Sequence, residues 1–409
     1  MPEPESESEK AGRPFKNAKP SAPVIAAASE LVRLELALKN KLHVDDAELE
    51  HLRGLPPDAG VILISNHADE MDPRICLELS RLSGKRFISM CNREAFDELS
   101  GMAGWVLQHL GHFSVERGAH DSHAKQYAID IVKNGEQILV IFPEGEIFYL
   151  NEKIQPFHSG VVEISMQALL QQREKNPDWK AFIVPMALKY HHHGPIEDAL
   201  EHRIEKMESH LNFKPSKEES FTTRLRRIQK TLLAMEETAH HIRQELQHDL
   251  FEEITRTEEA ILSEIEATHQ EIKVHPSQLI DKAWQLGAAI REELASDDSN
   301  QEELKKELAD LKEVAQLTSW HPDYIEEKAS FDRLAELVLK LERELFKVKR
   351  PKQLTRRDVH VTISTPIDIS SFVQDYETDA HAFRHSFTED LQKKVQAMVD
   401  RLVEKCEQR

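Results

Sequence analysis

The stretch VILISNHADEMDPR, residues 61–74, places an apolar run directly before a histidine and an aspartate. The run Val61–Ile64 has the length and residue types of a buried strand, and the polar residues after it indicate a strand-to-helix turn. On such a turn, Asp72 can return to His67 and fix the tautomer of its imidazole ring. The pair is therefore either a base with its orienting group or two polar residues of an ordinary turn.

Similar apolar runs alternate with helical stretches between about residues 54 and 190. They are HFSVE at 112–116, QILVIF at 137–142 and AFIVPMALKY at 181–190. Continuous apolar runs separated by helices are typical of strands buried on both faces of an α/β sheet. A further strand is expected at Val359–Ser364, and residues 388–409 have the pattern of an amphipathic helix.

Between about residues 197 and 350 the strand signals stop and helical periodicity takes over. Apolar residues recur there at steps of three and four: Leu225, Ile228, Leu232, Met235, Ala239, Ile242 and Leu246. This heptad predicts a helix with one apolar stripe, continued at steps of four by Leu250 and Ile254. One interpretation is a helical bundle that packs on itself. The other is an intermolecular coiled coil that makes the protein a homodimer.

The order of strand-like and helical segments predicts one α/β domain that is interrupted by helices. We expect a mixed sheet flanked by helices, with a long all-helical, partly coiled-coil insertion before the last strand. The expected boundaries are a disordered tail at 1–23, the first part of the α/β domain at 24–196, the insertion at 197–350 and the closing strand and helix at 351–409. A helix is expected at 24–43.

The composition excludes several functional classes. The formal net charge of −20 disfavours nucleic-acid binding, which needs a basic surface. Three scattered cysteines fit a reducing compartment and form no zinc motif. The acidic N-terminus is no signal peptide, and every apolar run is far shorter than the roughly 18–20 residues of a spanning helix. A cytoplasmic protein, peripheral to a membrane at most, is expected.

Three other segments carry candidate site residues. Arg117 lies in GHFSVERG between two glycines, where a guanidinium suits a phosphate or carboxylate, although an exposed surface arginine is the alternative. Glu144 and Gly145 follow a buried strand in ILVIFPEGEIF, at the sheet edge where α/β proteins place ligands. Pro185 is expected to interrupt its strand, and the histidines at 191–193 are read as a polar loop without a metal.

The order of these segments resembles a known family. N-H-x4-D, then G-x-F-x-x-x-R, then F-P-E-G, then an apolar strand with V-P is similar to the four-block pattern of the PlsC-like glycerolipid and lysophospholipid acyltransferases. The resemblance extends over about 45–190 and 355–405. It implies that His67 deprotonates an acceptor hydroxyl, that Asp72 orients His67, and that Arg117, Glu144 and Gly145 bind the polar head of the acceptor.

The resemblance also implies the partners. The acyl donor would be a thioester of coenzyme A or acyl carrier protein, the acceptor a glycerolipid or lysophospholipid at a membrane surface, and no metal or other cofactor would be needed. The sequence departs from the family after F-P-E-G, where Glu146 and Ile147 replace the common T-R, and at His158, where lysine is usual. These three residues are expected to affect acceptor specificity and to favour a head group that is small, neutral or cationic.

Two alternatives remain open at the level of the sequence. A thioesterase or other hydrolase would use the same His67–Asp72 pair to activate water instead of an alcohol. A non-enzymatic protein would keep the acyltransferase scaffold and act through its helical insertion.

Overall fold

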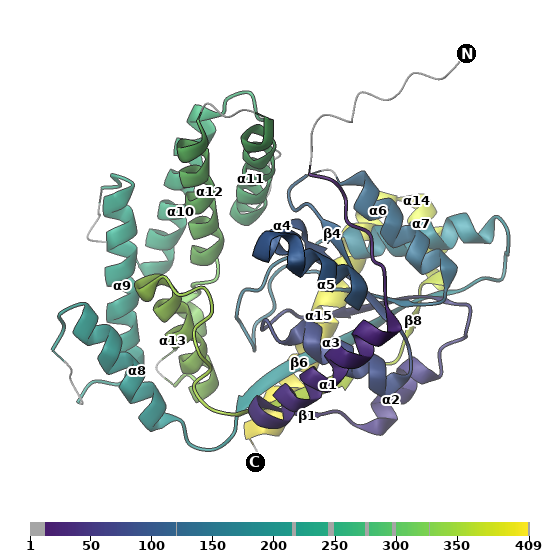
Figure 1. Cartoon of the computed structure of the whole chain (residues 1–409), viewed down its shortest axis with the longest axis horizontal. Helices are drawn as coiled ribbons and strands as arrows, with labels where there is room; N and C mark the ends of the chain where they lie inside the picture. Colours follow the sequence, from purple (N-terminus) through teal and green to yellow (C-terminus); the bar gives the residue numbers. More distant parts are fainter. Residues whose placement is uncertain are drawn as a thin grey trace.

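The chain folds into an α/β part and a helical part, which lie side by side (Figure 1). This computed structural model describes residues 13–119, 121–214, 218–243, 249–274, 278–296, 300–326 and 328–407. Of the tail predicted at 1–23, residues 1–12 lie outside the described part. Residues 13–21 differ from the prediction, because they run as an ordered, extended segment. Phe15 packs against Phe113, and the amide of Lys16 donates to Oγ of Ser114 at 2.8 Å.

Within the described residues, eight strands form one mixed sheet, as the sequence predicted. Their order is β1-β7-β6-β2-β5-β3-β4, with β8 beside β6. The strands are β1 (Asn40–His43), β2 (Gly60–Ser65), β3 (Phe87–Asn92), β4 (His112–Val115), β5 (Ile138–Ile141), β6 (Ala181–His192), β7 (Arg357–Ile363) and β8 (Ile367–Asp368). β2 to β6 pair in parallel, whereas β7 and β8 run antiparallel to β6 and β1 runs parallel to β7.

Helices cover both faces of this sheet. One face carries α6 (Ser122–Asn134), α7 (Gly160–Arg173) and α15 (Ala380–Glu407), and the other carries α1 (Ala22–Lys39), α2 (Asp46–Arg53) and α3 (Asp72–Ser83). The shorter helices are α4 (Arg93–Asp97), α5 (Met102–Leu110) and α14 (Val373–Thr378). Strand β2 shows why its sequence is continuously apolar. Its residues alternate between the two faces, Ile62 on one and Leu63 on the other, and all six are buried.

The predicted helix at 24–43 is in fact a helix followed by a strand. Helix α1 ends at Lys39, and Asn40–His43 pairs with Arg357–His360 of β7. The buried Asn40 accepts a hydrogen bond from Nε of Arg357 at 3.0 Å. This ladder with residues more than 300 positions away overrides the local helical pattern, which carries no information about such a distant partner.

Pro185 does not interrupt its strand, contrary to the prediction. Strand β6 runs continuously from Ala181 to His192, and Pro185 pairs with Ile64 of β2. The carbonyl of Pro185 accepts from the amide of Ser364, at the gap between β7 and β8. The backbone N and O of a strand residue face the same neighbouring strand, so the nitrogen of Pro185 also faces the gap between β7 and β8. The missing N–H therefore removes no hydrogen bond from the pairing of β6 with β7 or β8.

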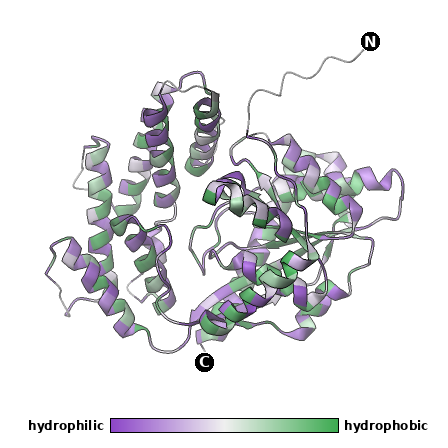
Figure 2. Cartoon of the chain, in the orientation of Figure 1, coloured by the Kyte–Doolittle hydropathy of each residue, from purple (hydrophilic) through white to green (hydrophobic). Residues whose placement is uncertain are grey.

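Among the residues that the structure describes between β6 and β7, six α-helices make up the helical part. They are α8 (Glu197–His210), α9 (Phe221–Ala239), α10 (Leu250–Thr268), α11 (Leu279–Ser296), α12 (Gln301–Leu317) and α13 (Phe331–Phe346). Hydrophobic and hydrophilic residues alternate along them, and the apolar ones meet in one shared core (Figure 2). This packing fits the bundle interpretation, while the homodimer stays a prediction.

The heptad of the sequence is divided between two helices. Helix α9 ends at Ala239, His241 adopts a positive φ of 55°, and α10 begins at Leu250. Leu246, which continued the predicted heptad, lies outside the described residues. Leu225 and Ile254 belong to the same core although they come from different helices. The periodicity therefore predicted the apolar stripe correctly and missed the turn.

The helical part leaves and rejoins the sheet at one point. His192, at the end of β6, is paired with Arg357, the first residue of β7, and the amide of His193 donates to the carbonyl of Arg356 at 2.8 Å. The helices are thus inserted into the connection of an antiparallel strand pair. The sheet itself is continuous across the junction.

A buried ionic cluster fastens the helical part to the sheet. Nζ of Lys189 on β6 lies 2.8 Å from carboxylate oxygens of both Glu152 and Asp332, the latter on α13. Nδ1 atoms of His191 and His192 each lie 2.9 Å from an oxygen of Asp332. These two histidines were predicted to lie in a polar loop, but they belong to β6 because antiparallel pairing with β7 extends to the end of the strand.

Candidate active site

His67 and Asp72 lie in direct contact at the carboxyl end of β2. His67 is in the loop that follows the strand, and Asp72 is the first residue of α3. Nδ1 of the imidazole is 2.8 Å from Oδ2 of Asp72. The N-terminus of α3 also favours a carboxylate at this position, because the helix dipole is positive there. The turn predicted from the sequence therefore joins the two side chains.

Asp72 is completely buried and accepts two further hydrogen bonds. The amide of Asp69 donates to Oδ2 at 3.0 Å, and the phenol of Tyr190 donates to Oδ1 at 2.5 Å. Burial raises the pKa of Asp72, and the hydrogen bond with His67 opposes that shift. Burial and the nearby Asp72 raise the pKa of Tyr190 well above its ordinary value, so the phenol keeps its proton and remains a donor.

The second ring nitrogen of His67, Nε2, is not hydrogen-bonded to Asp72 and is available to accept a proton. Phe142 stacks on the imidazole with ring centroids 4.1 Å apart and planes 17° from parallel. The side chain is 14% exposed, and Nε2 makes no hydrogen bond to any residue that the structure describes. With Nδ1–H donating to Asp72, Nε2 carries the lone pair. This arrangement can accept a proton from a hydroxyl group or a water molecule.

Glu144 is buried next to this pair, and both of its carboxylate oxygens accept hydrogen bonds from backbone amides. One carboxylate oxygen accepts from the backbone amide of His67 at 2.7 Å, and the other accepts from the amide of Gln155 at 2.9 Å. Burial raises the pKa of Glu144 to about 8, although both amide donors favour the ionised form. The resemblance implied that Glu144 binds the acceptor. Its geometry instead ties the loop of His67 to the segment that follows F-P-E-G.

Arg117, Gly145 and Glu146 form a second group next to the first. Arg117 follows β4, and its Nη1 donates to the carbonyl of Gly145 at 3.1 Å and forms an ion pair with Glu146. Gly145 adopts a φ of 74°, which favours glycine. The amide of Ile147 donates to the other oxygen of Glu146 at 2.9 Å. The guanidinium charge is therefore partly neutralised within the protein.

Helix α11 of the helical part covers this second group. The ring of Trp284 lies 5.4 Å from Cζ of Arg117, and the same distance separates its centroid from that of His158. A side chain at Gly118 would collide with the backbone of Trp284 at 2.1 Å. Arg291 of α11 also forms ion pairs with Glu116 and, on α4, with Glu94 (Figure 1). The helical part is thus in contact with the residues that were predicted to affect acceptor specificity.

The comparison with protein families agrees with this geometry. Residues 46–189 match the model of the acyltransferase family, the PlsC-like family. The α/β part of the chain therefore contains a domain that matches this family. The match spans β2 to β6 and includes His67, Asp72, Arg117 and Glu144. No curated protein matches the chain closely enough to count as a relative.

The matched domain makes the protein an acyltransferase, and the family suggests acceptors of the glycerolipid type. The structure brings the residues predicted for its site together in two adjacent groups, which are joined through the consecutive residues Glu144 and Gly145. The first group holds His67, Asp72 and Glu144, and the second holds Arg117, Gly145, Glu146, Ile147 and His158.

Two residues of the candidate site, Tyr190 and Trp284, could not be predicted from the sequence. Tyr190 stands at the end of the recognised strand AFIVPMALKY, so its position was noted, but nothing indicated its hydrogen bond to Asp72. Trp284 lies in the helical part, outside residues 46–189 that match the family. A lone tryptophan in an amphipathic helix reads as core, and only the tertiary structure places it on Arg117.

Proposed function

We propose that this acyltransferase moves a fatty acyl group from a thioester of coenzyme A or acyl carrier protein to a hydroxyl of a glycerolipid or lysophospholipid. The observation that carries the proposal is the 2.8 Å contact between Nδ1 of His67 and Asp72, which leaves Nε2 able to take a proton. The family match supports acyl transfer, and the site geometry supports His67 as its base.

The proposed reaction needs one base and no covalent enzyme intermediate. Nε2 of His67 removes the proton of the acceptor hydroxyl, while Asp72 holds Nδ1–H and stabilises the imidazolium that forms. The alkoxide oxygen attacks the thioester carbonyl and forms the new C–O bond. The tetrahedral intermediate then breaks its C–S bond, and the thiolate leaves and takes the proton from His67. An ester and a free thiol are the products, and His67 returns to its neutral form.

We propose further that the acceptor has a small head group that is neutral or cationic rather than a phosphate monoester. Arg117, the guanidinium that the resemblance assigns to the acceptor, is already paired with Glu146. Trp284 lies over it, and His158 and Asp281 of α11 face one another with Nε2 and Oδ1 at 3.8 Å. A phosphate that approached Arg117 would meet the negative charge of Glu146, which costs free energy by like-charge repulsion.

Replacing Glu146 by glutamine is therefore expected to shift the preference towards phosphate acceptors. The ratio of kcat/KM for lysophosphatidate to kcat/KM for lysophosphatidylethanolamine should rise about 10-fold, because a charge-assisted hydrogen bond contributes about 1.5–3 kcal/mol. Steady-state kinetics with labelled acyl-CoA measure this ratio. Glu163→Gln, which changes an ion pair with Lys125 on the α/β part, is the matched control. A wild-type enzyme that already prefers lysophosphatidate strongly would contradict the proposal.

A hydrolase is the second candidate, and the neutralised Arg117 is the observation that favours it. With no strong site for an acceptor head group, His67 would activate water by the same proton transfer. Incubation with labelled acyl-CoA and a panel of lysolipids separates the two functions by their products. Acylated lipid supports the transferase, whereas free fatty acid as the sole product supports the hydrolase.

We also propose that the protein docks on a membrane surface at its periphery. No helix of the described residues is long and apolar enough to cross a membrane. Helices α1 and α5 pack against one another, and together with the 3-10 turn Glu98–Gly101 before α5 they expose large apolar side chains. We call this set the apolar face: Leu31, Leu34, Leu38, Leu99, Met102, Trp105 and Val106. Exposed apolar patches of this kind mark interaction sites, and tryptophan favours the membrane–water interface.

The surroundings of the apolar face point to a lipid surface rather than to another protein. Lys349 and Arg350 lie beside it, the first paired with Glu98 next to Leu99 and the second with Glu70 in the loop of His67. Basic residues at the edge of an apolar surface suit anionic headgroups. The same two ion pairs connect the face to the loop that carries the proposed base, so a lipid acceptor would enter close to His67.

The double variant Leu34→Ser/Trp105→Ser is expected to bind liposomes containing anionic lipid at least about 100-fold more weakly than wild type. Each large apolar side chain transferred out of water contributes about 1.5–3 kcal/mol, and serine contributes almost none. Flotation with such liposomes measures the bound fraction. Phe251→Ser, which removes an exposed aromatic ring from α10, is the control. The apolar face would instead bind a second copy of the chain if the wild type does not bind liposomes but forms a dimer, and if the double variant is monomeric.

A further inference from the structure

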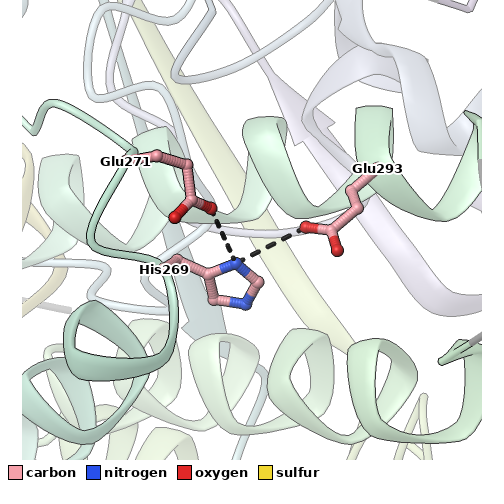
Figure 3. Close-up of side chains that lie close together, drawn as sticks. All are labelled: His269, Glu271 and Glu293. Carbon is pink, nitrogen blue, oxygen red and sulfur yellow. Dashed lines mark ion pairs between the residues drawn. The ribbon is translucent and has the colours of Figure 1, made fainter.

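Three side chains with ligand atoms converge in the helical part, at the junction of α10 and α11. His269 follows the last residue of α10, Glu271 lies in the loop after it, and Glu293 is on α11 (Figure 3). Nδ1 of His269 is 3.7 Å from an oxygen of Glu271 and 3.5 Å from an oxygen of Glu293. The three ligand atoms all lie within 4.8 Å of one another. Their positions give no recognisable spacing motif in the sequence.

Glu307 holds the imidazole of His269 in one orientation. Nε2 of His269 lies 2.7 Å from an oxygen of Glu307 on α12, and the hydroxyl of Thr268 donates to the other oxygen of Glu307 at 3.0 Å. His269 itself is buried, with 6% of its surface exposed. A histidine that binds a metal through one nitrogen usually donates its other N–H to a carboxylate, which fixes the tautomer.

This orientation leaves Nδ1 without a suitable partner. When Nε2–H donates to Glu307, the neutral ring directs its Nδ1 lone pair at two carboxylates, which is repulsive. Nδ1 makes no hydrogen bond to any residue that the structure describes, although its side chain is more than nine-tenths buried. Three carboxylates close to one buried imidazole favour a positive charge at Nδ1, either a proton or a metal ion between the ligands.

The distances favour the metal ion. Zinc binds histidine nitrogen and carboxylate oxygen at about 2.0–2.2 Å, so tetrahedral ligand atoms are about 3.4 Å apart. The observed separations of 3.5 and 3.7 Å are close to this spacing and long for hydrogen bonds. Imidazole suits zinc and its transition-metal neighbours, whereas magnesium and calcium prefer oxygen ligands alone. Glu271 and Glu293 have side chains that are 73% and 43% exposed, so water can fill the fourth position.

We propose that His269, Glu271 and Glu293 bind a divalent cation of the zinc class, with Glu307 orienting His269. The ion links α10 to α11 directly and to α12 through Glu307. It lies outside the proposed catalytic pair and takes no part in acyl transfer. Its role is to fix α11, the helix that places Trp284 on Arg117.

Metal titration of the full-length protein tests this site. The protein is first treated with a chelator. Calorimetry with Zn²⁺ and visible absorption with Co²⁺ should then each show one tightly bound metal ion per chain, and Mg²⁺ should not compete with Zn²⁺ for this site. Glu271→Gln and Glu293→Gln are each expected to weaken Zn²⁺ binding at least about 10-fold, and Glu307→Gln about 10- to 100-fold. At the same concentration, Zn²⁺ should raise the Tm of the wild type more than that of Glu271→Gln.

The matched control is His240→Gln. His240 is buried similarly, but its two acidic neighbours face different ring nitrogens, Glu264 at 3.5 Å from Nδ1 and Asp310 at 3.9 Å from Nε2. This variant should retain the tight equivalent. Circular dichroism establishes that each variant is folded, and Glu271 is exposed enough for its replacement to leave the fold intact. The proposal would be overturned if the wild type binds no Zn²⁺ tightly, or if Glu271→Gln and Glu293→Gln bind Zn²⁺ as tightly as the wild type. Either result would indicate a proton on Nδ1 instead of a metal ion.

Discussion

His67→Ala is expected to lower kcat/KM for acyl transfer by about 10²–10⁴-fold, because a positioned general base contributes that factor. Nε2 of His67 is the proposed proton acceptor, and the ring nitrogen that faces Asp72 at 2.8 Å fixes its tautomer. Asp72→Asn should show a loss of similar size, since asparagine can present an N–H to Nδ1 and stabilise the wrong tautomer. In both variants the loss should appear in kcat more than in KM.

The measurement is the rate of labelled acyl transfer from acyl-CoA to the best lysolipid acceptor. His385→Ala is the control, because His385 is exposed on α15 and forms an ion pair with the neighbouring, exposed Glu389. Its activity should equal that of the wild type. Thermal unfolding of His67→Ala distinguishes lost chemistry from lost structure. Acyl transfer that survives in a folded His67→Ala enzyme would refute the role of His67 as base.

Asp332→Asn is expected to lower the free energy of unfolding by about 3 kcal/mol. Removing one partner from a buried ion pair costs about 3–5 kcal/mol, because the other charge stays buried without compensation. We expect the lower end of this range, since Glu152 remains 2.8 Å from Nζ of Lys189. Denaturant unfolding followed by circular dichroism measures the difference. Asp323→Asn, at an exposed position near the same cluster, should change stability by less than about 0.5 kcal/mol.

The effect of Asp332→Asn should depend on pH in a defined direction. Burial acts to raise the pKa of Asp332, but the hydrogen bonds from His191 and His192 and the charge of Lys189 hold it well below the ordinary range. Its contribution is therefore present above about pH 4 and is lost as the pH falls below that value. The hydrogen bond to Asp332 raises the pKa of His191, so that contribution fades as the pH rises above about 6.5.

The wild type should accordingly exceed Asp332→Asn in stability most strongly between about pH 4 and 6.5. Unfolding curves of both proteins across this range provide the test. An equal stability difference at every pH would show that Asp332 acts by packing alone. No difference at any pH would show that the cluster does not stabilise the junction.

The proposed catalytic pair could be predicted from the sequence because its geometry is local. His67 and Asp72 are five residues apart on one turn, and a buried strand before them fixes where that turn lies. The strands themselves were predictable because burial on both faces demands continuous apolar runs, as in β2 and β5. Glu146 was also recognised as a departure from the family, but its pairing with Arg117 required the structure.

The parts that were missed depend on contacts between distant segments. Asn40 to His43 look helical until β7 supplies a partner for their backbone, and Trp284 looks like a core residue until α11 is placed on Arg117. Helical periodicity shows which side of a helix is apolar. It does not show where the helix ends, so α9 and α10 were read as one element.

The point at which the helical part joins the sheet has a consequence for how such a protein can be shortened. Since His192 and Arg357 are neighbours across one strand pair, a tight hairpin could bridge the gap and close the sheet by itself. The excision would take Asp332 from Lys189 and Arg333 from Glu152 at once, so Lys189 and Glu152 would remain as one buried ion pair. His191 and His192 would lose the carboxylate of Asp332. A minimal version of the chain therefore keeps Lys189 with Glu152 and replaces His192, the buried one of the two histidines.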